Sequence, residues 1–184
     1  IERLYRKLVP AMTKAASRAS VLIPGAAETA AALRGLGVRI GSGTGYTREM
    51  MAEILASAAR QGYAPEVVVC AGETPSGRPS PLMAWKALIA LDAWPANACI
   101  KVDDAPVGIE EGRLAGCCTV GLSASGNGVG LDRDSFLALS PIERQAKLAE
   151  AESALRAAGA DVIIEDVSQL MPVVHEIARR IAAS

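Results

Sequence analysis

The chain has 184 residues, 51% hydrophobic and 21% charged, which is enough apolar material for one globular domain with a full core. Nineteen basic residues against 20 acidic ones give a net charge of −1, and no basic cluster interleaves with aromatic residues, so we expect no nucleic-acid partner. No apolar run approaches the ~20 residues that span a bilayer, and residues 1–15 carry too many charges for a signal peptide. We therefore predict a cytoplasmic protein that binds small molecules and no membrane.

The first residues form an amphipathic pattern that lacks a helix start. Apolar residues recur at Ile1, Leu4, Tyr5 and Leu8, but no capping residue precedes them, and the chain opens on isoleucine. We therefore expect residues 1–12 to be the end of a helix that begins earlier, and the sequence to be a fragment of a longer chain.

From there on, helical patterns alternate with short apolar runs. The predicted helices span residues 26–36, 47–62, 81–91, 107–115 and 140–158, and a last one begins at 166 or 168. The predicted strands span residues 38–42, 67–70, 99–102, 118–122 and 161–164. Strands that alternate with helices and lack polar alternation indicate an α/β fold with a parallel sheet, in which ligands bind at the carboxyl ends of the strands.

The cysteines and the single histidine do not indicate a metal site or a catalytic pair. Cys70, Cys99, Cys117 and Cys118 fall in or beside apolar runs without metal-ligand spacing, so we interpret them as buried reduced thiols. The single histidine, His175, lies off the apolar face of the last predicted helix. Catalysis by a Ser-His or Cys-His pair therefore has no obvious base.

A glycine-rich turn, RIGSGTGYTR at residues 39–48, follows the first predicted strand. It does not fit a dinucleotide fingerprint, because Tyr46 replaces the third glycine, and it lacks the lysine of a Walker loop. A methyltransferase-type cofactor loop, with Glu73 as ribose partner, stays open, as does a tight turn without a ligand. The remaining interpretation is that the turn presents Thr44, whose hydroxyl and neighbouring amides would bind a phosphoryl group.

Two distant residues favour a phosphoryl ligand. Arg78 lies in SGRPSP, just before a predicted helix, where a guanidinium could neutralise phosphoryl charge, although a solvated loop arginine explains it equally well. Asp104 ends a buried strand, where a carboxylate needs a partner; Mg²⁺ is one candidate and a helix cap is the other. A hydroxyl, a cation and a metal-binding carboxylate at successive strand ends are the parts of a phosphoryl-transfer site.

Four strings, IGSGTGYTREMM, GRPSP, IKVDDAPVGIEEGRLAG and TVGL, together resemble the phosphonoacetaldehyde hydrolase family of the haloacid dehalogenase superfamily. The resemblance runs from about Ile23 through the loop after Leu122, and more loosely to the C-terminus. It implies a Rossmann-like core and a Mg²⁺-dependent enzyme that cleaves the carbon-phosphorus bond of phosphonoacetaldehyde to acetaldehyde and phosphate. It also implies an aspartate nucleophile and a lysine that forms a Schiff base, and we expect a homodimer when the chain is full length.

Position by position, the resemblance assigns the phosphoryl-binding residues. Thr44 would be the hydroxyl of the superfamily's second motif, with Gly45 beside it. Arg78 would take the place usually held by the third-motif lysine. Thr44 and Arg78 are thus the implied catalytic residues, and all three would bind the phosphoryl group.

The same resemblance makes Asp104 the metal ligand. Gly108 falls where many members have a second acid, so part of the metal shell is missing, and Asp103 is the candidate to compensate. The nucleophile and the Schiff-base lysine belong to the part of the family before the segment that matches Ile1. Asp132 and Lys101 do not replace them well, because Asp132 belongs to a DxD after a glycine-rich loop that fits a helix cap or loop acid, and Lys101 lies inside a predicted strand.

We therefore expect residues 1–20 to be the end of a helical cap domain with its linker, and residues 21–184 to be an α/β core without its first strand. In the superfamily that strand lies between the strands predicted here at 38–42 and 99–102. We expect these two strands to flank an open position, and residues 1–184 alone to be inactive and aggregation-prone. A methyltransferase-type cofactor-binding domain and a non-catalytic fragment are the alternatives.

Overall fold

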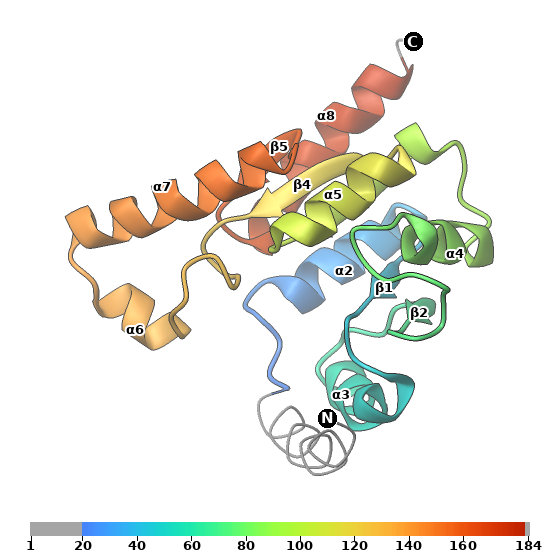
Figure 1. The fold of residues 1–184 in the computed structure, drawn as a ribbon, viewed down its shortest axis with the longest axis horizontal. Helices are drawn as coiled ribbons and strands as arrows, with labels where there is room; N and C mark the ends of the chain where they lie inside the picture. Colours follow the sequence, from blue (N-terminus) through green and yellow to red (C-terminus); the bar gives the residue numbers. More distant parts are fainter. Residues whose placement is uncertain (1–19, 183–184) are drawn as a thin grey trace.

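The computed structural model describes residues 20–182, so the helix predicted over residues 1–12 and almost all of the predicted cap segment lie outside the described part. The α-helices are α2 (Ala26–Gly35), α3 (Arg48–Arg60), α4 (Leu82–Ala90), α5 (Pro106–Ala115), α6 (Arg133–Ala138), α7 (Pro141–Ala157) and α8 (Leu170–Ala182). The strands are β1 (Gly41–Gly43), β2 (Val67–Val69), β3 (Ile100–Asp103), β4 (Cys118–Leu122) and β5 (Val162–Ile164), and two 3-10 turns are η1 (Ala96–Ala98) and η2 (Val167–Gln169). Figure 1 shows the alternation of strands and helices that the sequence predicts.

All strand pairs are parallel, as predicted, but they form two sheets. One sheet is β1–β2, and the other has the order β3–β4–β5. Within residues 20–182, β1 and β3 do not pair with each other, so each lies at the edge of its own sheet. The expectation that the strands preceding Thr44 and Asp104 flank an open position stays a prediction.

The first strand is shorter than predicted and begins at Gly41 instead of Val38. The N–H of Val38 donates to the carbonyl of Leu33 at the end of α2, and the N–H of Ile40 donates to the side chain of Glu66. Because both donors are already used, the regular ladder with β2 starts only at Gly41.

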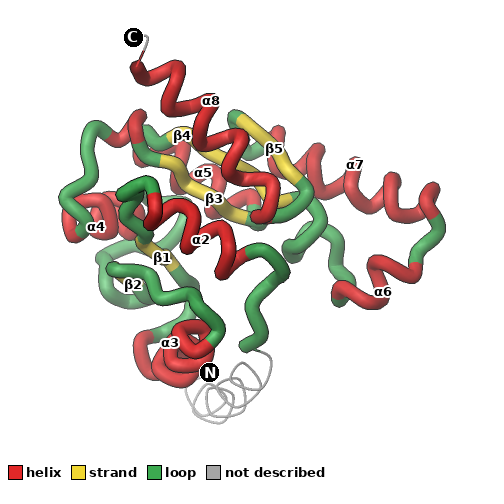
Figure 2. The backbone as a smooth tube through the Cα atoms, turned by 180° about the vertical axis from the view of Figure 1, so that it is seen from behind, coloured by secondary structure: helices red, strands yellow, loops and turns green. Residues whose placement is uncertain are grey.

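The helices cover both faces of the larger sheet. Helix α5 packs on β3 and β4 and contacts α7, whereas α2 contacts α8 and η2 on the opposite face, as Figures 1 and 2 show from the two sides. Helix α4 packs on β1 and β2 and also contacts α5. The apolar side chains that are at most 1% exposed include residues of both sheets and of α5 and α7: Val69, Ile109, Val120 and Leu155.

Helix starts and stops follow the sequence signals in most places. The hydroxyl of Ser140 accepts from the N–H of Glu143, whose carboxylate bonds back to Ser140, and Pro141 takes the first helical position of α7. Helix α5 stops at Gly116, whose φ of 85° is the left-handed conformation that glycine adopts freely. Helix α6 was not predicted, and Asp132 caps it by accepting from the N–H of Ser135, which confirms the helix-cap interpretation of that acid.

The thiol prediction is correct only in part. All four cysteines are free, but only Cys70 is buried, because Cys99, Cys117 and Cys118 sit where β3 and β4 begin, at the border of the core. Burial is the main cause that raises the pKa of Cys117 to about 11, so this thiol stays protonated at neutral pH. His175 is exposed on α8, as predicted.

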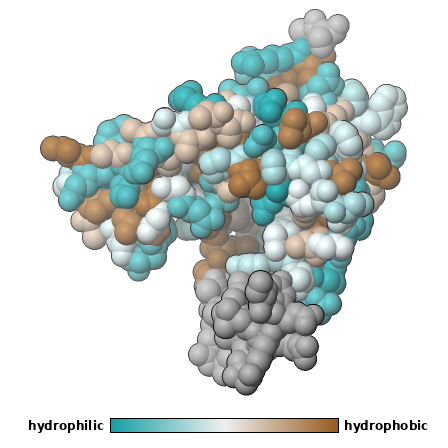
Figure 3. All heavy atoms as spheres, in the orientation of Figure 1, coloured by the Kyte–Doolittle hydropathy of each residue, from teal (hydrophilic) through white to brown (hydrophobic). Residues whose placement is uncertain are grey.

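The surface and the helix lengths add two general findings. In Figure 3, apolar residues form separate small areas between polar ones on the face that is seen. Among residues 20–182, none of the helices is both long enough and apolar enough to cross a bilayer.

Candidate active site

The glycine-rich turn begins at the end of β1 and leads into α3. The N–H of Thr44 donates to the carbonyl of Val69 at 3.0 Å, which extends the pairing with β2 by one residue. The hydroxyl oxygen of Thr44 accepts a hydrogen bond from the N–H of Tyr46 at 3.1 Å. Thr44 is half-buried and Gly45 is exposed, so the turn presents one open side. Thr47 stands at the N-cap of α3 as predicted, but its side chain makes no capping bond.

Arg78 lies in the loop between β2 and α4 and reaches across to this turn. Its Nη1 is 3.4 Å from Oδ2 of Asp103. Its Nη2 lies beside Gly45, because a Cβ on that glycine would be 3.2 Å from it. The Arg78 side chain is only 22% exposed, which rules out the solvated loop arginine that the sequence left open. The fold therefore brings together two of the predicted phosphoryl-binding residues, with Thr44 next to them in the turn.

Asp103, and not Asp104, is the acid that meets Arg78. Oδ2 of Asp103 also lies 2.9 Å from Nζ of Lys101, and Oδ1 accepts the N–H of Ala105 at 3.0 Å. The same ammonium is 2.9 Å from Oε2 of Glu111, whose side chain is 1% exposed. Two cations and two carboxylates thus form one chain of ion pairs beneath the turn.

Lys101 is held in its charged form. Burial would lower the pKa of Lys101, but the carboxylates of Asp103 and Glu111 outweigh that effect and raise the pKa above its ordinary value of 10.5. A Schiff base requires a neutral amine, so this ion-paired lysine agrees with the structural role predicted for it.

The ion-pair chain was only partly visible in the sequence. The sequence signal for Glu111 is its position on α5, where it falls on the same face as the buried Gly108, Gly112 and Ala115. A carboxylate on the buried face of a helix needs a cation, and Lys101 on the adjacent strand is the nearest candidate.

Gly108 makes room for the Asp103 carboxylate. A Cβ at Gly108 would lie 2.0 Å from Oδ2 and 2.4 Å from Oδ1 of Asp103. The carboxylate therefore fills the space that a side chain at position 108 would take. The Asp103 carboxylate thus lies over helix position 108, where the residue of the helix itself is a glycine.

Asp104 faces a different element. Oδ2 of Asp104 accepts a hydrogen bond at 2.8 Å from the N–H of Asn127, which lies in the loop after β4. In the same loop, a Cβ added at Gly126 would lie 2.2 Å from the Cβ of Asp104. The helix-cap alternative is wrong, because the N-cap of α5 is Ala105. Asp104 instead ties β3 to the loop that follows β4.

Asp104 can supply one ligand to a metal ion. Mg²⁺ commonly takes one or two carboxylates and fills its shell with water and phosphate oxygens, so a single carboxylate suits it. Among residues 20–182 no group of three or more His, Cys, Asp or Glu side chains is arranged to hold a metal ion. Asp103 is committed to Lys101 and Arg78, so the part of the chain that the structure describes offers Asp104 as the candidate ligand.

Glu73, the possible ribose partner of a methyltransferase-type site, is engaged within the fold. Its carboxylate accepts the N–H of Cys70 at 3.1 Å and two hydrogen bonds from the Arg48 guanidinium, at 2.8 and 2.9 Å. The bond from Cys70, followed by those from Arg48, lowers the pKa of Glu73. The carboxylate joins the end of β2 to the start of α3, which leaves it unsuited to a ribose.

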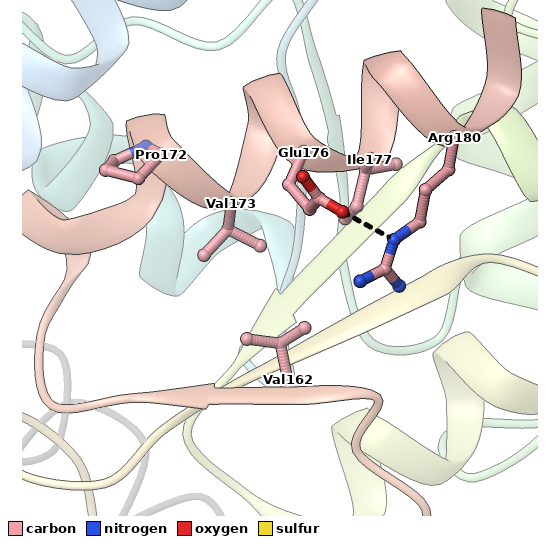
Figure 4. Close-up of a pocket in the computed structure, with 6 residues that line it drawn as sticks. All are labelled: Val162, Pro172, Val173, Glu176, Ile177 and Arg180. Atoms are coloured by element: carbon pink, nitrogen blue, oxygen red, sulfur yellow. Dashed lines mark hydrogen bonds and ion pairs between the residues drawn. The ribbon is translucent and has the colours of Figure 1, made fainter. Parts of the chain in front are cut away.

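Two surface hollows lie away from these residues. One, of about 300 Å³, is formed by Val162 of β5 and by α8, where Glu176 pairs with Arg180 (Figure 4). The other, of about 410 Å³, is lined by residues from Trp85 to Trp94 at the end of α4. Neither is lined by Thr44, Arg78 or Asp104.

Comparison with known proteins identifies relatives of this chain. The chain matches the model of haloacid dehalogenase-like hydrolases over residues 9–116. It is 47% identical over 182 residues to a phosphonoacetaldehyde hydrolase from Paraburkholderia phytofirmans, covering 99% of this chain and 68% of that protein. The crystal structure of a phosphonoacetaldehyde hydrolase-like protein from Oleispira antarctica is similar with a TM-score of 0.96 and 44% identity, over all of this chain and 66% of that one. A hydrolase of the same superfamily from Deinococcus radiodurans, with bound phosphate and sodium, has a TM-score of 0.63 and 26% identity, over 85% of this chain and 60% of that one.

The parallel α/β fold and the family match define the class: the chain belongs to the haloacid dehalogenase-like hydrolases. Within that class it belongs to the phosphonoacetaldehyde hydrolase family. It spans about two thirds of the length of these relatives, 68% of the first and 66% of the second.

Proposed function

We propose that this chain supplies the phosphoryl-binding and metal-binding part of an enzyme that hydrolyses the carbon-phosphorus bond of phosphonoacetaldehyde, giving acetaldehyde and phosphate. The observation that carries the proposal is the position of Arg78, with one guanidinium nitrogen beside Gly45 and the other at Asp103. Two further facts support it: the 47% identity to an enzyme with this name, and the phosphate bound in the Deinococcus radiodurans relative.

Each candidate residue has a distinct task in this proposal. The phosphoryl group lies against the turn, where the Thr44 hydroxyl and the amide of Gly45 donate to its oxygens. Arg78 neutralises the negative charge of these oxygens and holds the group in place. Asp104 holds Mg²⁺, which when bound neutralises further charge on the phosphoryl oxygens.

The covalent steps require groups beyond these residues. The family resemblance implies an aspartate that attacks phosphorus and a lysine that forms a Schiff base with the aldehyde. We do not assign the second role to Lys101, because it is ion-paired to both Asp103 and Glu111.

The test of the proposal is to replace Arg78 and measure both products in the complete natural protein. Arg78→Ala should reduce kcat/KM for phosphonoacetaldehyde by about 100-fold or more, the scale of a lost charge-stabilising donor. Arg78→Lys should recover part of that loss, because it keeps the charge but not the planar fork. Arg156→Ala is the matched control, since Arg156 is exposed on α7 and pairs with Glu152 of the same helix.

Ligand binding provides a second arm of the same test. Inorganic phosphate should raise the melting temperature of the parent and not of Arg78→Ala. A parent stabilised by S-adenosylmethionine instead of phosphate would reverse the proposal in favour of a methyltransferase-type site. Unchanged kcat/KM in Arg78→Ala would also refute it.

A further inference from the structure

Two cationic groups, those of Lys101 and Arg78, share one carboxylate oxygen of Asp103 at the centre of the site. Oδ2 of Asp103 is 2.9 Å from Nζ of Lys101 and 3.4 Å from Nη1 of Arg78. A hydrogen bond between a guanidinium and a carboxylate is normally about 2.7–2.9 Å long, so the Arg78 contact is weak and the Lys101 contact is strong. Asp103 therefore interacts more strongly with Lys101 than with Arg78.

The position of Asp103 is fixed from two further directions. Its second oxygen, Oδ1, accepts the N–H of Ala105, and its carboxylate lies directly over Gly108. Asp103 cannot easily rotate, so any change in the strength of its contact with Arg78 must come from movement of the arginine. A loop residue moves more readily than a strand residue whose carboxylate is fixed at both oxygens.

Lys101 is equally well fixed. Its stem passes over Gly112, where a Cβ would be 2.6 Å from Cγ of Lys101, and its ammonium is anchored to the buried carboxylate of Glu111. Within residues 20–182, Oε1 of Glu111 has no hydrogen-bond partner, and Oε2 accepts a hydrogen bond from Lys101. Lys101 is therefore the hydrogen-bond partner of this carboxylate in the described part of the chain.

We propose that Lys101 is a positioning residue for phosphoryl binding: by taking up the Asp103 carboxylate, it keeps the Arg78 guanidinium loosely held and directed at the glycine turn. Without the ammonium, Arg78 is the remaining charged partner of Asp103 among residues 20–182, and the two close into a tight fork-to-carboxylate pair. Nη2 then turns away from Gly45, and the phosphoryl group loses its cation. This inference rests on the proposed role of Arg78 as the phosphoryl-binding cation.

The test is a double-mutant cycle between positions 101 and 103, read out as the affinity for inorganic phosphate in the complete natural protein. All variants carry Glu111→Gln, so that removal of the lysine leaves no buried unpaired carboxylate. In that background Lys101→Met should weaken phosphate binding roughly tenfold, the scale of one charge-assisted contact. Lys147→Met is the control for the loss of one positive charge, because Lys147 is exposed on α7 and its partner Glu150 is 3.9 Å away.

The second half of the cycle separates positioning from a direct contact. When Asp103 is replaced by Asn, Arg78 has no carboxylate to close onto, so adding Lys101→Met should change phosphate affinity less than about twofold. A tenfold loss that persists in the Asp103→Asn background would mean that Lys101 attracts phosphate itself, and it would overturn the inference. An unchanged affinity of Lys101→Met for phosphate would overturn it too.

The outcomes also distinguish this inference from the proposed function. If Arg78→Ala does not weaken phosphate binding, the proposed function fails. If Arg78→Ala weakens it and Lys101→Met does not, only the positioning role fails. Cooperative melting of the Lys101→Met variant shows that it is folded, because a variant that fails to fold would not melt cooperatively.

Discussion

Replacing Gly108 by alanine has two opposite effects on the free energy of unfolding. Alanine is favoured over glycine inside a helix by about 1 kcal/mol, so helix propensity alone predicts a more stable protein. The Asp103 carboxylate predicts the reverse. The new Cβ would be 2.0 Å from Oδ2, whereas ordinary contact begins at 3.4 Å, so the carboxylate must move by more than an ångström.

The size of the loss follows from what that movement breaks. Forcing a methyl group into a filled space costs about 1–3 kcal/mol. Displacing Asp103 also ends its 2.9 Å contact with Lys101, and a hydrogen bond to a charged group contributes about 1.5–3 kcal/mol. After the gain in propensity is subtracted, we expect Gly108→Ala to lower the free energy of unfolding by about 1.5–5 kcal/mol.

Denaturant unfolding of the complete natural protein measures this difference. Gly35→Ala is the matched control, because nothing lies within 4 Å of a Cβ at the end of α2. That variant should be as stable as the parent or slightly more so. Adding Asp103→Gly to Gly108→Ala removes the steric conflict and should recover the steric share of the loss. If Gly108→Ala equals or exceeds the parent in stability, the carboxylate of Asp103 does not occupy this space and the ion-pair chain is misplaced.

Two further predictions concern the metal and the acid side of the stability curve. Asp104→Ala should weaken Mg²⁺ binding by about tenfold or more in calorimetry, because it removes the candidate carboxylate ligand, and equal affinity would exclude Asp104 from the site. The pKa of Glu73 is lowered from its ordinary value of 4.5, mainly by the bond from Cys70, so this group stabilises the fold above pH 4.5 and loses that contribution as the pH falls through the lowered pKa. Glu73→Gln should therefore be less stable than the parent at neutral pH, with a difference that shrinks below pH 4.5; a constant difference across that range would contradict it.

Periodicity was sufficient for the order of the elements, because each helix buries a stripe and each strand is apolar on both faces. It was not sufficient for β1, where hydrogen bonds to the end of α2 and to Glu66 replace the first residues of the ladder. It also missed α6, whose six residues lie in a segment rich in Gly and Ser. Short elements of this kind depend on one capping residue, here Asp132, more than on a repeated pattern.

The site could be predicted as far as strand ends determine it. Thr44 follows β1 and Arg78 lies in the loop after β2, so a parallel pair brings them to the same edge. The sequence could not show which of Asp103 and Asp104 contacts Arg78, because adjacent residues at the end of a strand point to opposite sides. Only the structure shows that Asp103 meets Arg78 and that Asp104 meets the loop after β4.

The separation of the two sheets makes the contact between Arg78 and Asp103 more than a local feature. Arg78 follows β2 of the smaller sheet, and Asp103 ends β3 of the larger one, so their ion pair joins two sheets that share no ladder among the described residues. Helix α4 is another link, because it packs on β1 and β2 and also contacts α5. A packed helix sets the distance between the sheets, whereas a 3.4 Å ion pair adapts to it. Packed helices such as α4 therefore hold the two sheets relative to each other, and the loosely held guanidinium of Arg78 is the part of the site that is free to follow a ligand.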